Sequence, residues 1–238
     1  MITVTELAKM IDHSILQPTH TDEDLIKQCT VARKYNVASV CVKPYAVRQA
    51  VKLLEGSDVA VGCVIGFPHG NSATAVKVFE TEQACNDGAV EIDMVINIGK
   101  ALGGDWKYVE NEIRTITETC HRNQAIVKVI FETDYITNTE DKIRLCEICT
   151  RVGSDFVKTS TGYGYVKLPT GDFNYKGATV SDIELMRKHS GPRVQVKCAG
   201  GVRSLDDLLK MKSAGATRSG ATATEAILTE ALKRFGSQ

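Results

Sequence analysis

The sequence lacks an excess of charge of either sign. Among its 238 residues, 29 Lys and Arg are balanced by 29 Asp and Glu, so the net charge is zero. Proteins that bind nucleic acids usually present a net basic surface, and this balance argues against a nucleic-acid partner. No apolar run approaches the ~20 residues that span a bilayer, so we expect no membrane partner. The amino terminus shows no basic stretch before an apolar core, which is the pattern of a signal peptide.

Cysteines are present, but not in the pattern of a disulfide framework. The chain has eight of them and is long enough to bury a large apolar core without cross-links. Cys41, Cys63 and Cys198 lie within apolar runs, which is typical of buried free thiols, so we expect a reducing, cytoplasmic location. Cys146 and Cys149 form one C-x-x-C in a helical pattern, without the further ligands that zinc requires, so we expect no metal site.

Short apolar runs rich in Val and Ile alternate with amphipathic stretches along the whole chain. Such runs favour β-strands, and their centres are about 30 residues apart, which is the size of a βα unit. A weaker candidate strand at 14–17 would bring the total to eight. The seven clearer runs are 38–42, 59–65, 90–97, 125–131, 155–160, 194–199 and 216–220.

The stretches between these runs have the features of helices. Thr21 and Ser204 are typical helix caps, and 105–120, 139–151 and 179–188 repeat apolar residues at helical spacing. Eight βα units in a chain of this length predict a (β/α)8 TIM barrel, formed as a single domain over 1–238. A doubly wound open sheet is the alternative, but no G-x-G-x-x-G follows the first strand.

One segment, 162–177, is long and shows no regular pattern. It contains three of the seven tyrosines of the chain. Loops of this length inside a compact domain are usually functional. The segment follows a strand, so we expect it on the catalytic face of the barrel, in the position of a lid.

Charged residues interrupt four of the apolar runs: Asp93, Lys128, Lys158 and Lys197. Parallel strands are buried on both faces, so a charge inside one is costly and needs an explanation. The two-residue period of a strand directs Asp93 and Lys128 into the barrel. Lys158 and Lys197 lie near the carboxyl ends of their strands, where the active sites of barrels are built.

Three lysines and one aspartate would therefore share a partly desolvated space. Burial and neighbouring ammonium groups both lower the pKa of a lysine. A neutral amine can attack a carbonyl and form a Schiff base, and a carboxylate beside it can stabilise the remaining cation and shuttle protons. The alternative is a buried ion-pair network that only holds the strands together. Perturbed groups cluster at active sites, which favours function.

Two glycine-rich turns indicate an anion site. One is 200–203, after the seventh run, and the other is 215–222, around the eighth. The loops after strands seven and eight of a barrel commonly hold phosphate, because glycine lets backbone N–H groups approach the oxygens closely. The alternative for each is a tight turn without a ligand.

With these features, the chain resembles the 2-deoxyribose-5-phosphate aldolases, a family of class I aldolases. The combination of VKTSTG with a later K-x-x-G-G-V-R is particularly specific. The matching segments run through nearly the whole chain: 11–16 (IDHSIL), 39–44 (SVCVKP), 64–70 (VIGFPHG), 91–97 (EIDMVIN), 128–132 (KVIFE), 156–162 (FVKTSTG) and 196–203 (VKCAGGVR).

The resemblance implies roles that the residues alone do not assign. Lys158 corresponds to the lysine that forms the Schiff base, Lys197 to the second lysine that lowers its pKa, and Asp93 to the acid that transfers protons with Lys197. It also implies a substrate-binding set, which is Asp12, Lys128, Thr159, Gly162, Gly200, Gly201, Arg203, Gly220 and Thr222.

The expected reaction is reversible cleavage of 2-deoxy-D-ribose 5-phosphate to D-glyceraldehyde 3-phosphate and acetaldehyde. It needs neither a metal nor an organic cofactor, because the imine is the electron sink. The expected partner is a small phosphorylated sugar, and a homodimer is the expected assembly, since barrels of this kind often form dimers. One alternative is a Schiff-base aldolase for another sugar phosphate or an unphosphorylated aldehyde. A non-catalytic phosphosugar-binding barrel is the other.

Two departures from the family pattern bear on these alternatives. Many members are much shorter between TSTG and the next Gly-Ala-Thr, whereas here 163–175 lengthens the stretch. Many also have Ser-Ser after the glycine of the eighth strand, where this chain has Gly220-Ala-Thr-Ala-Thr. Thr222 replaces one hydroxyl and Ala223 cannot replace the other, so phosphate binding is expected to differ from that of such members.

Overall fold

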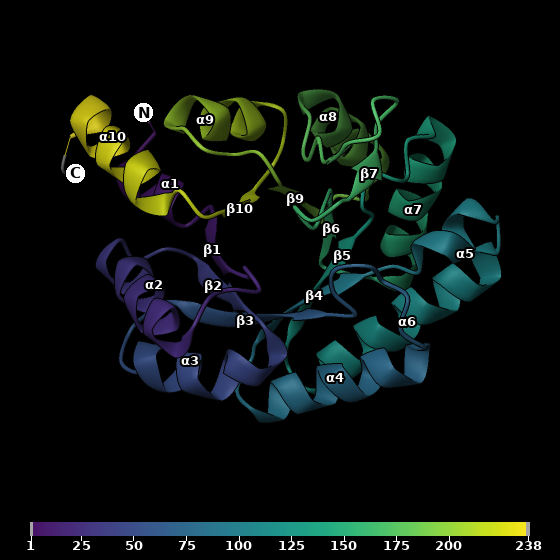
Figure 1. The fold of residues 1–238 in the computed structure, drawn as a ribbon, viewed down its shortest axis with the longest axis horizontal. Helices are drawn as coiled ribbons and strands as arrows, with labels where there is room; N and C mark the ends of the chain where they lie inside the picture. The colour runs from purple at the N-terminus through teal and green to yellow at the C-terminus, as the bar shows by residue number, and fades with distance from the viewer. Residues whose placement is uncertain (1, 237–238) are drawn as a thin grey trace.

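A computed structural model describes residues 2–236 of the chain. Eight parallel strands close into a barrel, with helices around its outside (Figure 1). The strands follow their chain order around the barrel, and β10 pairs with β1 to close it. They are β1 (Ile11–Ile15), β2 (Ser39–Val42), β3 (Ala60–Ile65), β4 (Glu91–Val95), β5 (Ile126–Ile130), β6 (Phe156–Lys158), β9 (Gln195–Ala199) and β10 (Arg218–Ala221).

Helices and one short 3-10 turn connect the strands. Two helices begin at the predicted caps, since Thr21 and Ser204 each accept a hydrogen bond from a backbone N–H of the first turn. Within residues 2–236, no helix is both long and apolar enough to cross a membrane. The elements are α1 (Val4–Ala8), α2 (Asp22–Lys34), η1 (Pro44–Ala46), α3 (Val47–Leu54), α4 (Thr74–Asn86), α5 (Ile98–Leu102), α6 (Trp106–Arg122), α7 (Thr139–Val152), α8 (Val180–His189), α9 (Leu205–Ser213) and α10 (Thr224–Phe235).

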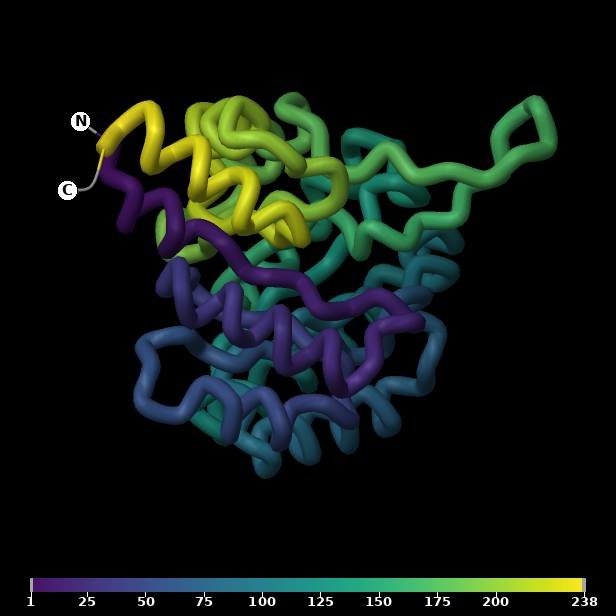
Figure 2. The backbone as a smooth tube through the Cα atoms, turned by 60° about the vertical axis from the view of Figure 1, so that its left-hand side comes forward, coloured from purple at the N-terminus to yellow at the C-terminus, as the bar shows by residue number. Residues whose placement is uncertain are grey.

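The closed barrel confirms the predicted fold, and the open-sheet alternative is wrong because β1 and β10 are hydrogen-bonded neighbours. The first strand required a correction. It begins at Ile11 rather than at residue 14, and its polar residues Asp12 and His13 obscured the apolar pattern. Both polar side chains are buried, so the strand is as enclosed as its neighbours. α1 and α10 lie side by side in both whole-molecule views (Figures 1 and 2).

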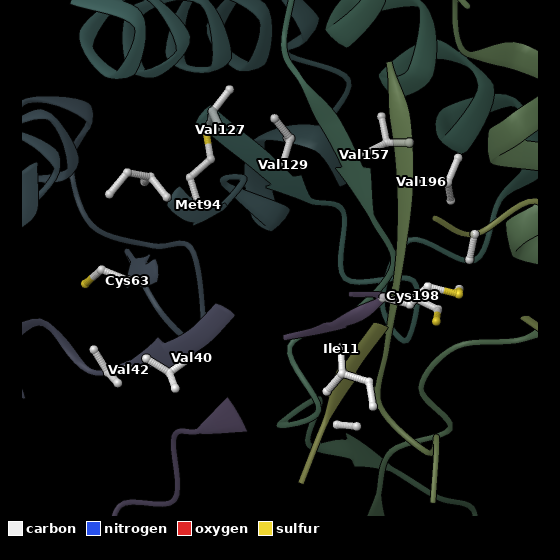
Figure 3. Close-up of a cluster of buried hydrophobic side chains, with 14 of the residues drawn as sticks. Ile11, Val40, Val42, Cys63, Met94, Val127, Val129, Val157, Val196 and Cys198 are labelled. Carbon is white, nitrogen blue, oxygen red and sulfur yellow. The ribbon is translucent and has the colours of Figure 1, made fainter. Parts of the chain in front are cut away.

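The two faces of the barrel strands carry different chemistry. Apolar side chains such as Val40, Met94, Val127 and Val196 form the buried core between the strands and the helices (Figure 3). Alternate residues point the other way, as the two-residue period requires. The predicted inward direction of Asp93 is confirmed by its contacts with lysines from three other strands.

The 162–177 segment leaves the carboxyl end of β6 and is not wholly irregular. It contains a short antiparallel hairpin, with β7 (Val166–Lys167) paired to β8 (Phe173–Asn174). The rings of Tyr165 and Phe173 stack with centroids 4.5 Å apart. The hairpin projects from the body of the molecule (Figure 2), and its role as a lid stays a prediction.

Candidate active site

Asp93 is the centre of the charges inside the barrel. Its Oδ2 lies 2.6 Å from the Nζ of Lys158 and 2.6 Å from the Nζ of Lys197. Its Oδ1 lies 3.0 Å from the Nζ of Lys128. The register of the strands brings these side chains together. Asp93 lies opposite Lys128 on β4 and β5, and Lys158 lies opposite Lys197 on β6 and β9.

A deeper layer of charges continues the network toward the amino ends of the strands. Lys128 is 2.5 Å from Glu91 and 3.0 Å from Asp12, and Arg218 forms ion pairs with the same two carboxylates. The sequence reasoning missed Glu91 and Arg218 as members of this group. The signal was available, because Glu91 shares the inward face of its strand with Asp93.

The network holds four cations and three carboxylates, so its charges do not balance when all groups are ionised. Within residues 2–236, Lys158 contacts one carboxylate, Asp93. Lys197 contacts two, Asp12 at 2.5 Å and Asp93 at 2.6 Å. Lys128 contacts three carboxylates. Lys158 therefore has the least compensation for its positive charge.

The pKa values follow this ranking. Burial lowers the pKa of Lys158 below its ordinary value, and the ammonium of Lys197 lowers it further, against the attraction of Asp93. Burial also acts to lower the pKa of Lys197, but Asp12 and Asp93 outweigh it, so that this pKa is raised. For Lys128 the carboxylates outweigh burial as well, and its pKa is raised well above the ordinary value. Lys158 is thus the amine that loses its proton most readily.

Asp93 remains a carboxylate in this environment. Burial acts to raise its pKa, but the three lysines outweigh burial and hold the pKa well below its ordinary value. A carboxylate shared by an ammonium and a neutral amine is a short path for a proton between them. The arrangement can therefore supply a nucleophilic amine and return a proton to it.

A cleft of about 200 Å³ opens at the carboxyl ends of β1, β6, β9 and β10. Lys158, 3% exposed, is the member of the charge network that lines it. The glycine-rich turns form another part of its lining, which we call the anion end. The lining residues are Ser14, Leu16, Gln17, Lys158, Thr161, Gly162, Tyr163, Tyr175, Ala199, Gly200, Gly201, Val202, Arg203, Gly220, Ala221 and Thr222.

Six of the predicted substrate-binding residues line this cleft: Gly162, Gly200, Gly201, Arg203, Gly220 and Thr222. Asp12, Lys128 and Thr159 do not, because each is completely buried. Their contact with substrate therefore stays a prediction. Asp12 and Lys128 act on the other charges of the network, and the Thr159 hydroxyl bonds to the backbone of Ala199 on β9.

Glu132, just after β5, is a buried carboxylate that the sequence reasoning did not single out. Its backbone has φ of 57°, in the left-handed region that is strained for a residue other than glycine. It accepts hydrogen bonds from the backbone N–H and the hydroxyl of Thr161, which lines the cleft. Burial raises the pKa of Glu132 to about 7, with the two Thr161 hydrogen bonds opposing the rise.

A separate buried ion pair lies outside the barrel, between α4 and α6. Lys77 Nζ is 2.9 Å from Glu112 Oε1, and both side chains are 0% exposed. Lys77 also donates to the carbonyls of Gly70 and Val95 at 2.8 Å each, while Glu112 accepts from the Asn97 N–H at 2.9 Å. This pair joins the ends of β3 and β4 to the surrounding helices.

Comparison with known proteins agrees with the geometry. The family model described as "DeoC/LacD family aldolase" matches residues 6–229. The chain belongs to this family. Membership in an aldolase family identifies the chain as an aldehyde-lyase, so the alternative of a non-catalytic barrel is not supported.

Individual relatives of this aldolase cover nearly all of the chain. A deoxyribose-phosphate aldolase from Rhodopirellula baltica is 50% identical over 231 residues, covering 97% of this chain and 91% of the relative. One from Thermococcus gammatolerans is 49% identical over 217 residues, covering 90% and 92%. The crystal structure of a putative deoxyribose-phosphate aldolase from Coccidioides immitis is similar with a TM-score of 0.88 and 35% identity, covering 96% of this chain and 87% of that one.

Proposed function

We propose that this aldolase cleaves 2-deoxy-D-ribose 5-phosphate reversibly to D-glyceraldehyde 3-phosphate and acetaldehyde, through a Schiff base on Lys158. One observation carries the proposal: a single cleft is lined both by the least compensated lysine, Lys158, and by a glycine-rich turn, 200–203. An open-chain sugar phosphate has a carbonyl at one end and a phosphate at the other, which matches this arrangement. The names of the relatives support the same substrate.

In the first step, the neutral amine of Lys158 attacks the C1 aldehyde of the open-chain sugar. Water leaves and a protonated imine forms between Nζ and C1. Asp93, whose carboxylate lies 2.6 Å from this nitrogen, stabilises the positive charge. The amine is available because burial and Lys197 lower the pKa of Lys158.

In the second step, the bond between C2 and C3 breaks. The C3 hydroxyl passes its proton through water to Asp93, which returns it to the Lys197 pair. C3 becomes the aldehyde of D-glyceraldehyde 3-phosphate, and the bonding electrons move into the imine to give an enamine. Protonation of the enamine at C2 and hydrolysis of the imine release acetaldehyde and regenerate the amine. The imine is the electron sink throughout, so the mechanism requires no metal or organic cofactor.

Asp93 and Lys197 are assigned to the proton transfers. The raised pKa of Lys197 keeps a proton on its ammonium, and Asp93 lies 2.6 Å from both lysines. A proton from Lys197 crosses Asp93, with water completing the path to C2. Asp12, at 2.5 Å from Lys197, helps to hold that ammonium in place.

The direct test is turnover of 2-deoxy-D-ribose 5-phosphate, with both acetaldehyde and D-glyceraldehyde 3-phosphate measured as they form. The proposal predicts equal amounts of the two products. It is wrong if neither product appears from a folded preparation, or if an unrelated sugar phosphate is cleaved in its place.

A second candidate substrate class is unphosphorylated aldehydes. The turn after β10 favours it, because Thr222 lines the cleft while the neighbouring Ala223 provides no hydroxyl for a phosphate. Comparing kcat/KM for 2-deoxyribose with and without its phosphate separates the candidates. The main proposal requires a clear preference for the phosphorylated sugar.

We also propose that the chain self-associates, with the homodimer as the smallest assembly. The structure of the aldolase from Aeropyrum pernix is described as tetrameric, and it resembles this chain with a TM-score of 0.85 and 28% identity, covering 98% of this chain and 93% of that one. Light scattering after size-exclusion chromatography measures the mass directly. A monomer at micromolar concentration would contradict this part of the proposal.

A further inference from the structure

The 162–177 segment is fixed to the barrel at both ends by residues that follow β5. At its start, Thr161 donates to the Glu132 carboxylate and the Tyr165 N–H donates to the Tyr135 hydroxyl at 3.0 Å. At its end, Asp134 Oδ1 accepts from the N–H groups of Lys176 at 2.6 Å and Gly177 at 3.0 Å. The hairpin tip projects outward, but its base is held against the barrel.

The base of the segment also packs directly on the anion turn. A Cβ at Gly177 would lie 2.6 Å from the carbonyl oxygen of Gly200, so only glycine allows the two backbones to approach this closely. The Ala178 N–H donates to the carbonyls of Ala199 and Gly200, both at 3.1 Å. The end of the 162–177 segment therefore packs directly against the proposed phosphate site.

This packing places two tyrosines on the cleft wall with different surroundings. Tyr163 contacts Phe67 edge to face, with ring centroids 5.4 Å apart, and forms an apolar wall. The Tyr175 hydroxyl instead accepts a hydrogen bond from Arg203 Nη2 at 3.3 Å. Both Tyr175 and Arg203 line the cleft at its anion end.

Most of the N–H donors of the Arg203 guanidinium have no side-chain partner among the described residues. Within residues 2–236 its guanidinium forms no ion pair, and Tyr175 is its one side-chain partner. A guanidinium carries five N–H donors in a planar fork that suits phosphate oxygens. A long exposed arginine loses much of its side-chain freedom when it binds, and a hydrogen bond that already holds it reduces that cost.

We propose that Tyr175 is a specificity-determining residue of this aldolase: its hydroxyl orients Arg203 across the anion end of the cleft, so that the guanidinium and the backbone N–H groups of Gly200 and Gly201 bind the substrate phosphate together. The proposal rests on the proposed function. This role gives the 162–177 segment a function, because the segment supplies Tyr175 of the Tyr175–Arg203 pair. Phosphate binding by the oriented Arg203 also compensates for the hydroxyl that Ala223 lacks.

Tyr175→Phe tests the proposal, because it removes one hydroxyl and keeps the ring. The preference for 2-deoxyribose 5-phosphate over 2-deoxyribose, measured as the ratio of kcat/KM values, is expected to fall about tenfold, the effect of one hydrogen bond to a charged group. The loss is expected mainly in KM for the phosphorylated sugar. The matched control is Tyr165→Phe on the same hairpin, whose ring is 64% exposed and does not line the cleft. It should retain the wild-type ratio.

A double variant separates orientation of Arg203 from a general effect on packing. Arg203→Met alone should lower the ratio at least as much as Tyr175→Phe, and adding Tyr175→Phe to it should cause little further loss, since both act through one contact. Additive losses, or a Tyr175→Phe ratio equal to that of wild type, would overturn the proposal. So would equal losses on both sugars, because these would indicate a structural role.

Binding of inorganic phosphate, measured by calorimetry without any turnover, makes the test independent of the substrate assignment. Phosphate affinity should fall about tenfold in Tyr175→Phe and remain unchanged in Tyr165→Phe. If the wild-type protein bound phosphate in this way but did not cleave 2-deoxyribose 5-phosphate, the proposed function would fail and the role of Tyr175 would stand. If Tyr175→Phe bound phosphate as wild type does, the role of Tyr175 would fail.

Discussion

Two regions of this aldolase bury clusters of ionisable side chains, and they differ in charge balance and in access from the cleft. Between α4 and α6, Lys77 and Glu112 form a pair of one cation and one anion, with carbonyl and N–H groups satisfying the remaining bonds. Inside the barrel, four cations share three carboxylates, and one of those cations, Lys158, lines an open cleft.

The comparison shows that burial of charge is not sufficient for reactivity. Burial lowers the pKa of Lys77 as it does that of Lys158, but Lys77 is enclosed and has a carboxylate of its own. Among residues 2–236, Lys158 contacts one carboxylate, which it shares with two other lysines, and it is reached from the cleft. An unbalanced cluster with access to substrate can give up a proton and attack a carbonyl, whereas a balanced, enclosed pair holds the fold together.

The largest effect on rate is expected for Asp93→Asn. The change removes the carboxylate that contacts all three lysines, and with it the proton path to the imine. A fall in kcat/KM of about 10²- to 10⁴-fold is expected from the loss of general acid–base catalysis. Glu91→Gln is the matched control, since Glu91 contacts Lys128 and Arg218 but not Lys158. Equal losses in both variants would mean that the network acts as one structural unit.

The largest effect on stability is expected outside the barrel, for Lys77→Met. It leaves Glu112 buried without its cation, which costs about 3–5 kcal/mol in the free energy of unfolding, measured in urea. The double variant Lys77→Met with Glu112→Met should recover much of this loss, because no unpaired charge remains. Protein that stays folded should still form the Schiff base. If Lys77→Met lost Schiff-base formation and kept its stability, the α4–α6 pair would not be purely structural, and its distinction from the barrel network would fail.

Glu132 extends the comparison, because it is a buried carboxylate whose pKa is raised from 4.5 to about 7 by burial. The folded state therefore binds a proton more tightly than the unfolded state, and its stability falls as pH rises from 4.5 toward 7. Asp134 and Lys158 are the charged groups that act on it. Glu132→Gln keeps an oxygen acceptor for Thr161 and removes the charge.

As pH rises from 5 to 8, wild type should lose stability that Glu132→Gln keeps. The difference in free energy of unfolding, variant minus wild type, should therefore increase by up to about 3 kcal/mol. Urea unfolding of both proteins at several pH values measures the difference. A difference that stays constant with pH would show that Glu132 ionises as an ordinary exposed carboxyl does.

Lys197→Met is expected to move the pH profile of the reaction. Its ammonium lowers the pKa of Lys158, so its removal raises that pKa. A higher pKa means that the amine becomes protonated at higher pH, and the acid limb of kcat/KM should shift toward alkaline pH. The rate of imine formation with acetaldehyde, followed against pH, isolates this step from the later proton transfers. A shift toward acid pH would contradict the assignment.

The sequence allowed much of the barrel interior to be predicted, because a strand has a period of two. Charges at alternate positions in apolar runs directed Asp93 and Lys128 inward, and their register then brought them together. Arg218 was missed because it lies beside glycine-rich residues that were interpreted as an anion turn. The proposed roles of Lys158 and Lys197 could not be assigned from the residues alone, because they depend on how many carboxylates each lysine contacts.

The anion end of the cleft was predicted less completely. Its backbone turns were marked by glycines, but the Tyr175–Arg203 contact joins side chains 28 residues apart through a hairpin that the sequence pattern did not reveal. The hairpin strands have two residues each, too short for a period to be visible. Its anchors, such as Asp134, lie on another loop, and nothing in the local sequence indicates a partner 42 residues away.

Reductive trapping tests the central claim, that the unbalanced cluster makes Lys158 the nucleophile. The protein is incubated with 2-deoxyribose 5-phosphate, reduced with borohydride, digested, and the modified peptide is identified by mass. The expected result is one adduct, on Lys158, and none in Lys158→Leu. An adduct on Lys77, Lys128 or Lys197 in the wild-type protein, or none from a preparation that turns over the substrate, would contradict it.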